Sequence, residues 1–165
     1  MLPLIIDPSK VKVGLTGAGE ALVKRRAHLA EAGVDPVVIR PDDRDGLSGL
    51  SILYIAGLEH EISAALAGRA RAQGILVNVE DVPVLCDFHV PATVRRGDLL
   101  LTVSSGGRSP GLVSLIREWL SDQFGSEWSE RVAEIGAKRA DWRASGLSPA
   151  QISEKTRALA HWWFG

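Results

Sequence analysis

Short apolar runs alternate with alanine-rich amphipathic segments through the first half of the chain. Two stretches, residues 20–32 and 59–73, carry apolar side chains at helical spacing and are followed or ended by a glycine. Strands that alternate with helices predict a parallel sheet covered by helices on both faces. The apolar runs that we expect to form its strands are residues 11–15, 37–39, 52–56 and 75–77.

The pattern changes after Pro83. Residues 88–94 and 99–103 predict two extended segments joined by a turn. Three helical patterns follow, and the first and third begin with a Ser-Pro pair, at residues 109–110 and 148–149. Serine as N-cap and proline at the first helical position favour a helix start. We therefore expect a small α/β region followed by a helical region.

Composition excludes several classes of protein. The 165 residues carry 19 Lys plus Arg against 20 Asp plus Glu, so no basic excess favours nucleic acid or an anionic membrane. A single cysteine, Cys86, excludes a disulfide framework, and without a Cys/His cluster we expect no metal site. No run approaches the ~18 apolar residues of a membrane span. The first residues lack the basic region of a signal peptide, so we expect a cytoplasmic protein.

All five tryptophans lie at or beyond Trp119, within the helical region. Aromatic side chains gathered in this way favour helix packing or a subunit interface over a binding cage. The basic run at residues 24–26 on the first predicted helix is typical of a solvated helix face.

Gly17, Ala18 and Gly19 follow the first predicted strand and open the first predicted helix, which is the context of the dinucleotide fingerprint. The first glycine permits the tight turn, and the second lets the backbone approach a pyrophosphate at the helix N-terminus. The third small position of the fingerprint is Leu22. Arg40 ends the second strand and either meets a 2′-phosphate or is solvated. A dinucleotide site and a tight turn without a ligand fit this motif equally well.

Asn78, Glu80 and Asp81 lie at the carboxyl end of the fourth predicted strand, where open α/β sheets bind their ligands. A carboxylate there can act as a general base or orient a substrate. Taken alone, however, two adjacent acidic residues are more often ordinary turn residues.

The loop at residues 104–110 is the most informative string. Its serines, Gly106, Gly107 and Arg108 precede a helix start, and such a loop presents backbone N–H groups to an anion. Two arginines in the preceding turn add positive charge, namely Arg95 and Arg96. A plain strand-to-helix turn with solvated arginines is the alternative, but the combination favours a phosphate or carboxylate site.

Taken together, the strings GILVNVED and LCDFHVPATVRRGDLLLTVSSGGRSPGLVSLIRE resemble the precorrin-2 dehydrogenase / sirohydrochlorin ferrochelatase family, the N-terminal module of siroheme synthase. The family's NV-x-D, F-x-x-P and S-x-GG-x-SP elements are in register from Asn78 to Pro110. The resemblance runs from about Val11 to Trp119. It implies a shortened Rossmann-like NAD-binding domain at residues 1–82 and a dimerisation and substrate region at 83–125, followed by a small helical region at 126–165.

The resemblance implies NAD-dependent oxidation of precorrin-2, a tetrapyrrole, to sirohydrochlorin in siroheme biosynthesis, by a homodimer; some members also insert ferrous iron. It assigns a catalytic role to Asp81, which would take a proton as hydride leaves for the nicotinamide. The expected cofactor-binding residues are Gly17, Ala18, Gly19, Arg40, Ala56 and Gly57. The expected substrate-binding residues are Asn78, Arg95, Arg96, Ser105, Gly106, Gly107 and Arg108.

This chain departs from the family pattern on the cofactor side. Leu58 stands where the family has a polar residue that contacts the dinucleotide, and Ser63 stands where an asparagine is expected. Residues 41–53 are shorter than the strand and helix that typical members place there, which predicts that the second strand is a sheet edge. The alternative is therefore a degenerate member that binds a tetrapyrrole, or inserts metal, without NAD-dependent redox chemistry. A regulatory nucleotide-sensing module and a choice of NADP over NAD also stay open.

Overall fold

A computed structural model describes residues 1–43 and 45–163 of the chain. The chain divides into two compact units, Met1–Val90 and Pro91–Gly165, and each is described by itself. Among the described residues, no helix is both long and apolar enough to cross a bilayer.

The first unit contains a sheet of four parallel strands, as the sequence predicts. These are β1 (Val13–Gly17), β2 (Val37–Val38), β3 (Ile52–Ala56) and β4 (Leu76–Val79), and their order in the sheet is β2-β1-β3-β4. The prediction that the second strand lies at an edge is confirmed. Its two valines are 41% and 53% exposed because nothing pairs with the outer side of this strand in the described sheet.

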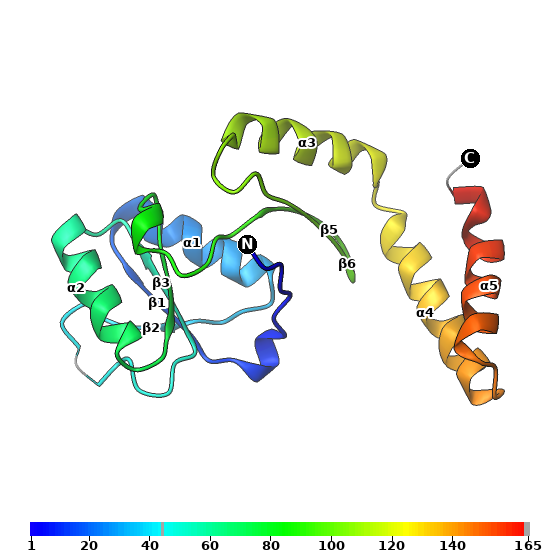
Figure 1. Ribbon diagram of the computed structural model, residues 1–165, viewed down its shortest axis with the longest axis horizontal. Helices are drawn as coiled ribbons and strands as arrows, with labels where there is room; N and C mark the ends of the chain where they lie inside the picture. The colour runs from blue at the N-terminus through cyan, green and yellow to red at the C-terminus, as the bar shows by residue number, and fades with distance from the viewer. Residues whose placement is uncertain (44, 164–165) are drawn as a thin grey trace. The chain divides into compact units, whose positions relative to one another are not determined.

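Two helices cover the opposite faces of this sheet, α1 (Gly19–Glu31) and α2 (His60–Arg71) (Figure 1). Leu29 of α1 packs with Leu15 and Ile52 on one face. Leu66 of α2 packs with Leu53 and its neighbours on the other, because adjacent residues of a strand point to opposite faces. The predicted two-faced covering of the sheet is thus confirmed.

The chain after β4 turns back and lies along the free edge of that strand. A 3-10 turn, Pro83–Leu85, leads into Cys86 and Asp87. Asp87 accepts hydrogen bonds from the backbone N of Val77 (2.9 Å) and from Arg71 Nε (2.8 Å), and its own N–H donates to the Val77 oxygen (2.8 Å). Because residues 85–88 satisfy this edge, the extended segment predicted from residue 88 begins only at Ala92.

The second unit is a β-hairpin followed by three helices. Strands β5 (Ala92–Arg96) and β6 (Leu99–Val103) pair antiparallel, and α3 packs against them. The helices are α3 (Pro110–Gln123), α4 (Trp128–Ala144) and α5 (Pro149–Ala160), and a short 3-10 turn follows at His161–Trp163. A similar turn, Pro8–Lys10, precedes β1 in the first unit.

Aromatic packing holds part of the helical region together. Trp128 is 8% exposed, and its ring lies 4.9 Å from Phe124 and 6.0 Å from Trp163. The guanidinium of Arg131 lies over the rings of both tryptophans. Trp119, in contrast, is 59% exposed. Helix packing therefore accounts for some of the clustered tryptophans and not for all of them.

The hydrogen bonds of Asp87 predict a measurable contribution to stability. Asp87→Ala removes a charged acceptor from the edge of β4 and from Arg71, so we expect the free energy of unfolding to fall by about 1.5–3 kcal/mol. Urea unfolding measures this change. The exposed Asp35→Ala variant is the matched control, and equal midpoints for the two variants would contradict the edge-capping role.

Candidate active site

The strand order places the predicted cofactor segments together. The chain leaves β1 toward β2 on one side and returns to β3 on the other, so the strand order switches between β1 and β3. Open parallel sheets bind ligands at such a point, outside the carboxyl ends of the strands. Gly17 ends β1 and leads into Ala18 and Gly19. Ala56 ends β3 and is followed by Gly57, and Ala18 N donates to Ala56 O at 3.0 Å. The structure therefore brings these two predicted segments side by side.

Two glycines make this close approach possible. A Cβ on Gly17 would overlap the carbonyl oxygen of Ala56. A Cβ on Gly57, whose φ is 67°, would overlap the carbonyl oxygen of Ala18. Only glycine fits both the space and, at Gly57, the left-handed backbone. The crossing of the two turns therefore depends on the absence of these side chains.

The crevice has the features that a dinucleotide needs. Helix α1 begins at Gly19 with its backbone N–H groups directed toward this end of the sheet, and a helix N-terminus favours a phosphate. The glycine turns and the helix N-terminus together fit the pyrophosphate part of a dinucleotide.

Arg40 is engaged with its own neighbour. Its Nε and Nη2 donate to the Asp42 carboxylate at 3.1 and 2.6 Å, and both side chains are exposed. This hydrogen-bonded pair lowers the pKa of Asp42 and raises that of Arg40. The contact favours the solvated interpretation of Arg40 over a role toward a 2′-phosphate.

The two residues that depart from the family pattern on the cofactor side, Leu58 and Ser63, contact each other. The Ser63 hydroxyl donates to the carbonyl oxygen of Leu58 at 3.4 Å, and the Leu58 side chain packs against the core under α2. Ser63 is 1% exposed. These two side chains thus serve packing at the start of α2 and supply no exposed polar group to the crevice.

Asp81 stands in an unusual backbone conformation at the end of β4. Its φ is 58°, a left-handed value shared by no other non-glycine residue among those described. This region is uncommon for residues with a side chain, although Asp and Asn adopt it more readily than others, and such outliers concentrate at functional sites. Asp81 is exposed, and it lies at the same carboxyl end of the parallel strands as the glycine turns. The structure thus places it where the sequence predicts a general base.

Asn78 serves the interior of the unit. It is 7% exposed, and its amide nitrogen donates to the Phe88 oxygen at 2.9 Å, with Cys86 Sγ at 3.6 Å. The thiol of Cys86 also bonds Val79 through its backbone, accepting from N at 3.3 Å and donating to O at 3.1 Å. Both residues fasten the chain to the edge of β4. Asn78 offers little surface to a substrate.

The prediction of a solvated helix face is wrong for Arg25. Its side chain is only 13% exposed, and its Nη2 lies 3.2 Å from Glu80 Oε1. Its guanidinium also lies 5.5 Å from the ring of Tyr54. The helical spacing of Leu22, Arg25 and Leu29 was the available signal, because residues three and four apart share a helix face.

The second unit carries the predicted anion loop, and its serines are engaged within it. Ser105 Oγ accepts from Ser109 N at 3.0 Å, and Ser104 Oγ accepts from Gly106 N at 3.2 Å. The predicted helix start is confirmed, because Ser109 is the N-cap residue of α3 and Pro110 its first residue, although the Ser109 side chain makes no capping hydrogen bond. The Ser105 hydroxyl still has a proton to donate.

The loop also presents two glycines and an arginine. Gly106 and Gly107 have φ of 66° and 80°, which turns their amides in a way that suits glycine. Arg108 is exposed beside them at the start of α3. The charge and the exposed donors needed for a carboxylate are therefore present on this unit.

The two arginines of the hairpin have different surroundings. Arg95 is exposed. Arg96 donates to the carbonyl oxygens of Phe124 (2.7 Å) and Ser121 (3.0 Å), and thus fastens the C-terminal end of α3. These contacts give Arg96 a structural role, so Arg95 is the better candidate of the two for an anionic ligand.

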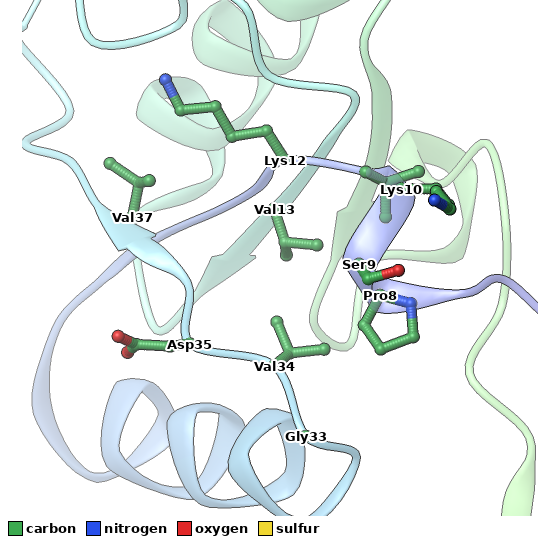
Figure 2. Close-up of a pocket in the computed structure, with 10 residues that line it drawn as sticks. Pro8, Ser9, Lys10, Lys12, Val13, Gly33, Val34, Asp35 and Val37 are labelled. Atoms are coloured by element: carbon green, nitrogen blue, oxygen red, sulfur yellow. The ribbon is translucent and has the colours of Figure 1, made fainter.

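A hollow of about 360 Å³ lies elsewhere on the first unit. Figure 2 shows Pro8, Val13 and Val34 around it. Its lining residues precede or begin β1 and β2, so it lies at the amino ends of these strands. Ligands of open parallel sheets bind at the opposite ends, and this hollow is therefore separate from the candidate site.

Comparison with known families now bears on this site. Residues 4–92 match the family model described as "Putative NAD(P)-binding", which spans more than half of the chain and contains both glycine turns and Asp81. The chain belongs to this NAD(P)-binding family. NAD(P) is accordingly the cofactor indicated for the crevice between β1 and β3.

The chain is also similar to siroheme synthases. It is 36% identical to that of Ectopseudomonas mendocina over 90% of this chain, and 30% identical to that of Methylococcus capsulatus over 98%. It spans 36% and 32% of the length of these relatives. These matches confirm the resemblance to the siroheme synthase module.

A solved structure supports the fold. The chain "SirC, precorrin-2 dehydrogenase" aligns with a TM-score of 0.76 over 96% of this chain and 89% of its own length, at 17% sequence identity. This similarity confirms the Rossmann-like architecture followed by the smaller region.

Among the described residues, no group of three or more His, Cys, Asp or Glu could hold a metal ion.

The close approach of the glycine turns predicts the effect of one added methyl group. Gly17→Ala forces the turn away from Ala56, so we expect NAD to lose its protection against thermal unfolding, which for a saturated site is about 2.7 kcal/mol at a hundredfold excess over Kd. Gly68→Ala, on an open face of α2, should keep that protection. Equal protection of both variants by NAD would place the cofactor elsewhere.

Proposed function

We propose that this protein oxidises precorrin-2 to sirohydrochlorin with NAD as hydride acceptor, in siroheme biosynthesis. The observation that carries the proposal is the position of Asp81, in a left-handed turn at the sheet edge that also holds the two glycine turns. The family match to an NAD(P)-binding module and the similarity to siroheme synthases support the same assignment. The cytoplasmic location predicted from the sequence belongs to this proposal.

In this proposal, the two glycine turns hold the dinucleotide, whose nicotinamide is the hydride acceptor. The residues of these turns are Gly17, Ala18, Gly19, Ala56 and Gly57. Removal of a hydride from the reduced macrocycle leaves a proton to be removed from the same substrate. The Asp81 carboxylate accepts that proton, because it is exposed and stands at the carboxyl end of the sheet. Precorrin-2, NAD and a base thus give sirohydrochlorin, NADH and the protonated base.

The second unit recognises the carboxylates of the macrocycle in this proposal. Arg95 and Arg108 are exposed guanidinium groups that can each bind a carboxylate through two parallel hydrogen bonds. Ser105 donates its hydroxyl proton, and the glycines of the loop allow the substrate to approach the backbone. Arg96 supports the hairpin and Asn78 supports the turn before Asp81, each through the contacts given above.

A second candidate function follows from the cofactor side of the site. Leu58 and Ser63 pack into the unit and supply no exposed polar group to the adenosine part of NAD, and β2 is an open edge next to the crevice. A member that binds the tetrapyrrole, or inserts ferrous iron into it, without redox chemistry would have the same features. Anaerobic incubation with precorrin-2 and NAD separates the two functions, since only the first yields NADH.

The left-handed backbone decides which substitution tests Asp81. Asparagine tolerates a positive φ and alanine does so poorly, so Asp81→Asn removes the charge and keeps the turn. We expect NADH formation to slow by about 10²–10⁴-fold with unchanged NAD protection against unfolding. Asp35→Asn, on the far edge of the sheet, should leave the rate unchanged. Full activity of Asp81→Asn would remove the proposed base.

The exposed face of α3 supports a homodimer as the working state. Four apolar side chains at helical spacing lie on one side of this helix: Leu112, Leu115, Ile116 and Trp119, which are 53%, 65%, 37% and 59% exposed. A stripe on one helix can pack against its own copy about a two-fold axis, because such an interface uses the same patch twice. We therefore infer that a second copy of this chain covers the stripe.

Leu115→Glu places a charge in the middle of this stripe. We expect the variant to sediment as a monomer at concentrations where the unchanged protein sediments as a dimer. Ser114→Glu puts the same charge one residue away, on the opposite side of α3, and should remain dimeric. A monomeric unchanged protein, or a dimeric Leu115→Glu variant, would contradict the interface.

A further inference from the structure

Glu80, next to the proposed base, belongs to an ion pair that is more shielded from solvent than the other ion pairs among the described residues. Its Oε1 lies 3.2 Å from Arg25 Nη2, and the two side chains are 24% and 13% exposed. In every other ion pair among the described residues, at least one side chain is more exposed than either of these two. In the Lys24–Glu20 pair, for example, the side chains are 65% and 79% exposed. Exposed pairs contribute little to structure, whereas loss of one partner of a shielded pair leaves an uncompensated charge.

The contacts of Arg25 join three parts of the first unit. Arg25 belongs to α1, Tyr54 to β3 and Glu80 to the turn after β4. The guanidinium lies 5.5 Å from the Tyr54 ring, which in turn meets the Phe88 ring edge-on at 5.5 Å. Arg25 is thus fixed by an aromatic face as well as by the carboxylate, and its position is set before any ligand binds.

The second carboxylate oxygen of Glu80 is enclosed by the protein. Glu80 Oε2 is buried and has no hydrogen-bond partner among the described residues. Its backbone is fixed too, because Glu80 N donates to Ile55 O at 2.9 Å. A carboxylate enclosed in this way acts on its surroundings through Arg25, and the residue that it holds in place is its neighbour Asp81.

The backbone after Glu80 needs such an anchor. Asp81 has a φ of 58°, a left-handed value that Asp adopts more readily than most residues with a side chain but that is still uncommon, and a single bond from Val82 N to Val79 O at 3.3 Å closes the turn. Strained residues keep their conformation only where their surroundings over-determine it. A fixed residue on each side of Asp81 meets that requirement: Glu80 through Arg25, and Val82 through Val79.

We propose that Arg25 and Glu80 are positioning residues that hold the Asp81 turn in its left-handed conformation and so aim its carboxylate at the substrate. The role in the reaction rests on the proposed dehydrogenase function, whereas the effect on the turn does not. The pair therefore predicts two separate readouts, one in the free protein and one in turnover.

The test compares Arg25→Met with Arg26→Met, an exposed arginine at the next position of α1. Amide hydrogen exchange at Glu80 and Val82, whose N–H groups donate to Ile55 O and Val79 O, should become about tenfold faster or more in Arg25→Met and stay unchanged in Arg26→Met. Tyr54 is the only tyrosine, so its absorbance titration reports on the same place. Burial raises its pKa above 10.0 and Arg25 opposes that rise, so Arg25→Met should raise the pKa further.

The double variant Arg25→Met, Glu80→Leu separates positioning from simple stability. It removes both charges, so its melting temperature should return toward that of the unchanged protein. Exchange at the turn should stay fast, and kcat should stay about tenfold or more below normal with KM for NAD unchanged. Restoration of slow exchange and of kcat by the double variant would overturn the proposal.

The outcomes also separate this proposal from the proposed function. Unchanged slow exchange at Glu80 and Val82 in Arg25→Met, together with the expected change in the pKa of Tyr54, would overturn the positioning role whatever the turnover. Fast exchange in Arg25→Met, in a protein that forms no NADH from precorrin-2 and NAD, would support the effect on the turn and refute the dehydrogenase function.

Discussion

The architecture of the site depends on the hydrogen bond from Ala18 N to Ala56 O, which joins the end of β1 to the end of β3 at 3.0 Å. The bond forms because Gly17 and Gly57 leave no Cβ between the two turns. It brings the start of α1 to the point where the strand order switches, which is where a parallel sheet binds an anionic cofactor. A methyl group on either glycine would separate the turns and open the crevice.

The sheet ends differently on its two sides, and the candidate site reflects this difference. On the side of β4, Asp87, Cys86 and the carbonyl of Phe88 satisfy the free edge and bring the chain back from the Asp81 turn. On the side of β2, two exposed valines form an open edge. The β4 side of the candidate site is thus firmly built, while the β2 side has less supporting structure.

The strands, the helices and the glycine turn could be predicted from the sequence, because apolar period and glycine position are local signals. The helical spacing of Arg25 with Leu22 and Leu29 places it on the buried face of α1, but its partners could not be predicted, because Glu80 is 55 residues away and Tyr54 lies on another strand. The same reason applies to Arg96, whose partners are carbonyl oxygens at the end of α3. Asn78 was placed at the correct end of its strand, but only the return of the chain to Phe88 shows that its amide is used internally.

The central claim is that the crevice between β1 and β3, next to the Asp81 turn, is where the chain binds NAD. Titration of the isotope-labelled protein with NAD, followed by amide chemical shifts, tests this claim most directly. We predict that the largest shifts occur at Gly17, Gly19, Gly57 and Asp81, with none at Gly33 and Asp35 beside the hollow at the other end of the sheet. Shifts confined to Gly33 and Asp35, or no shifts at millimolar NAD, would contradict the account.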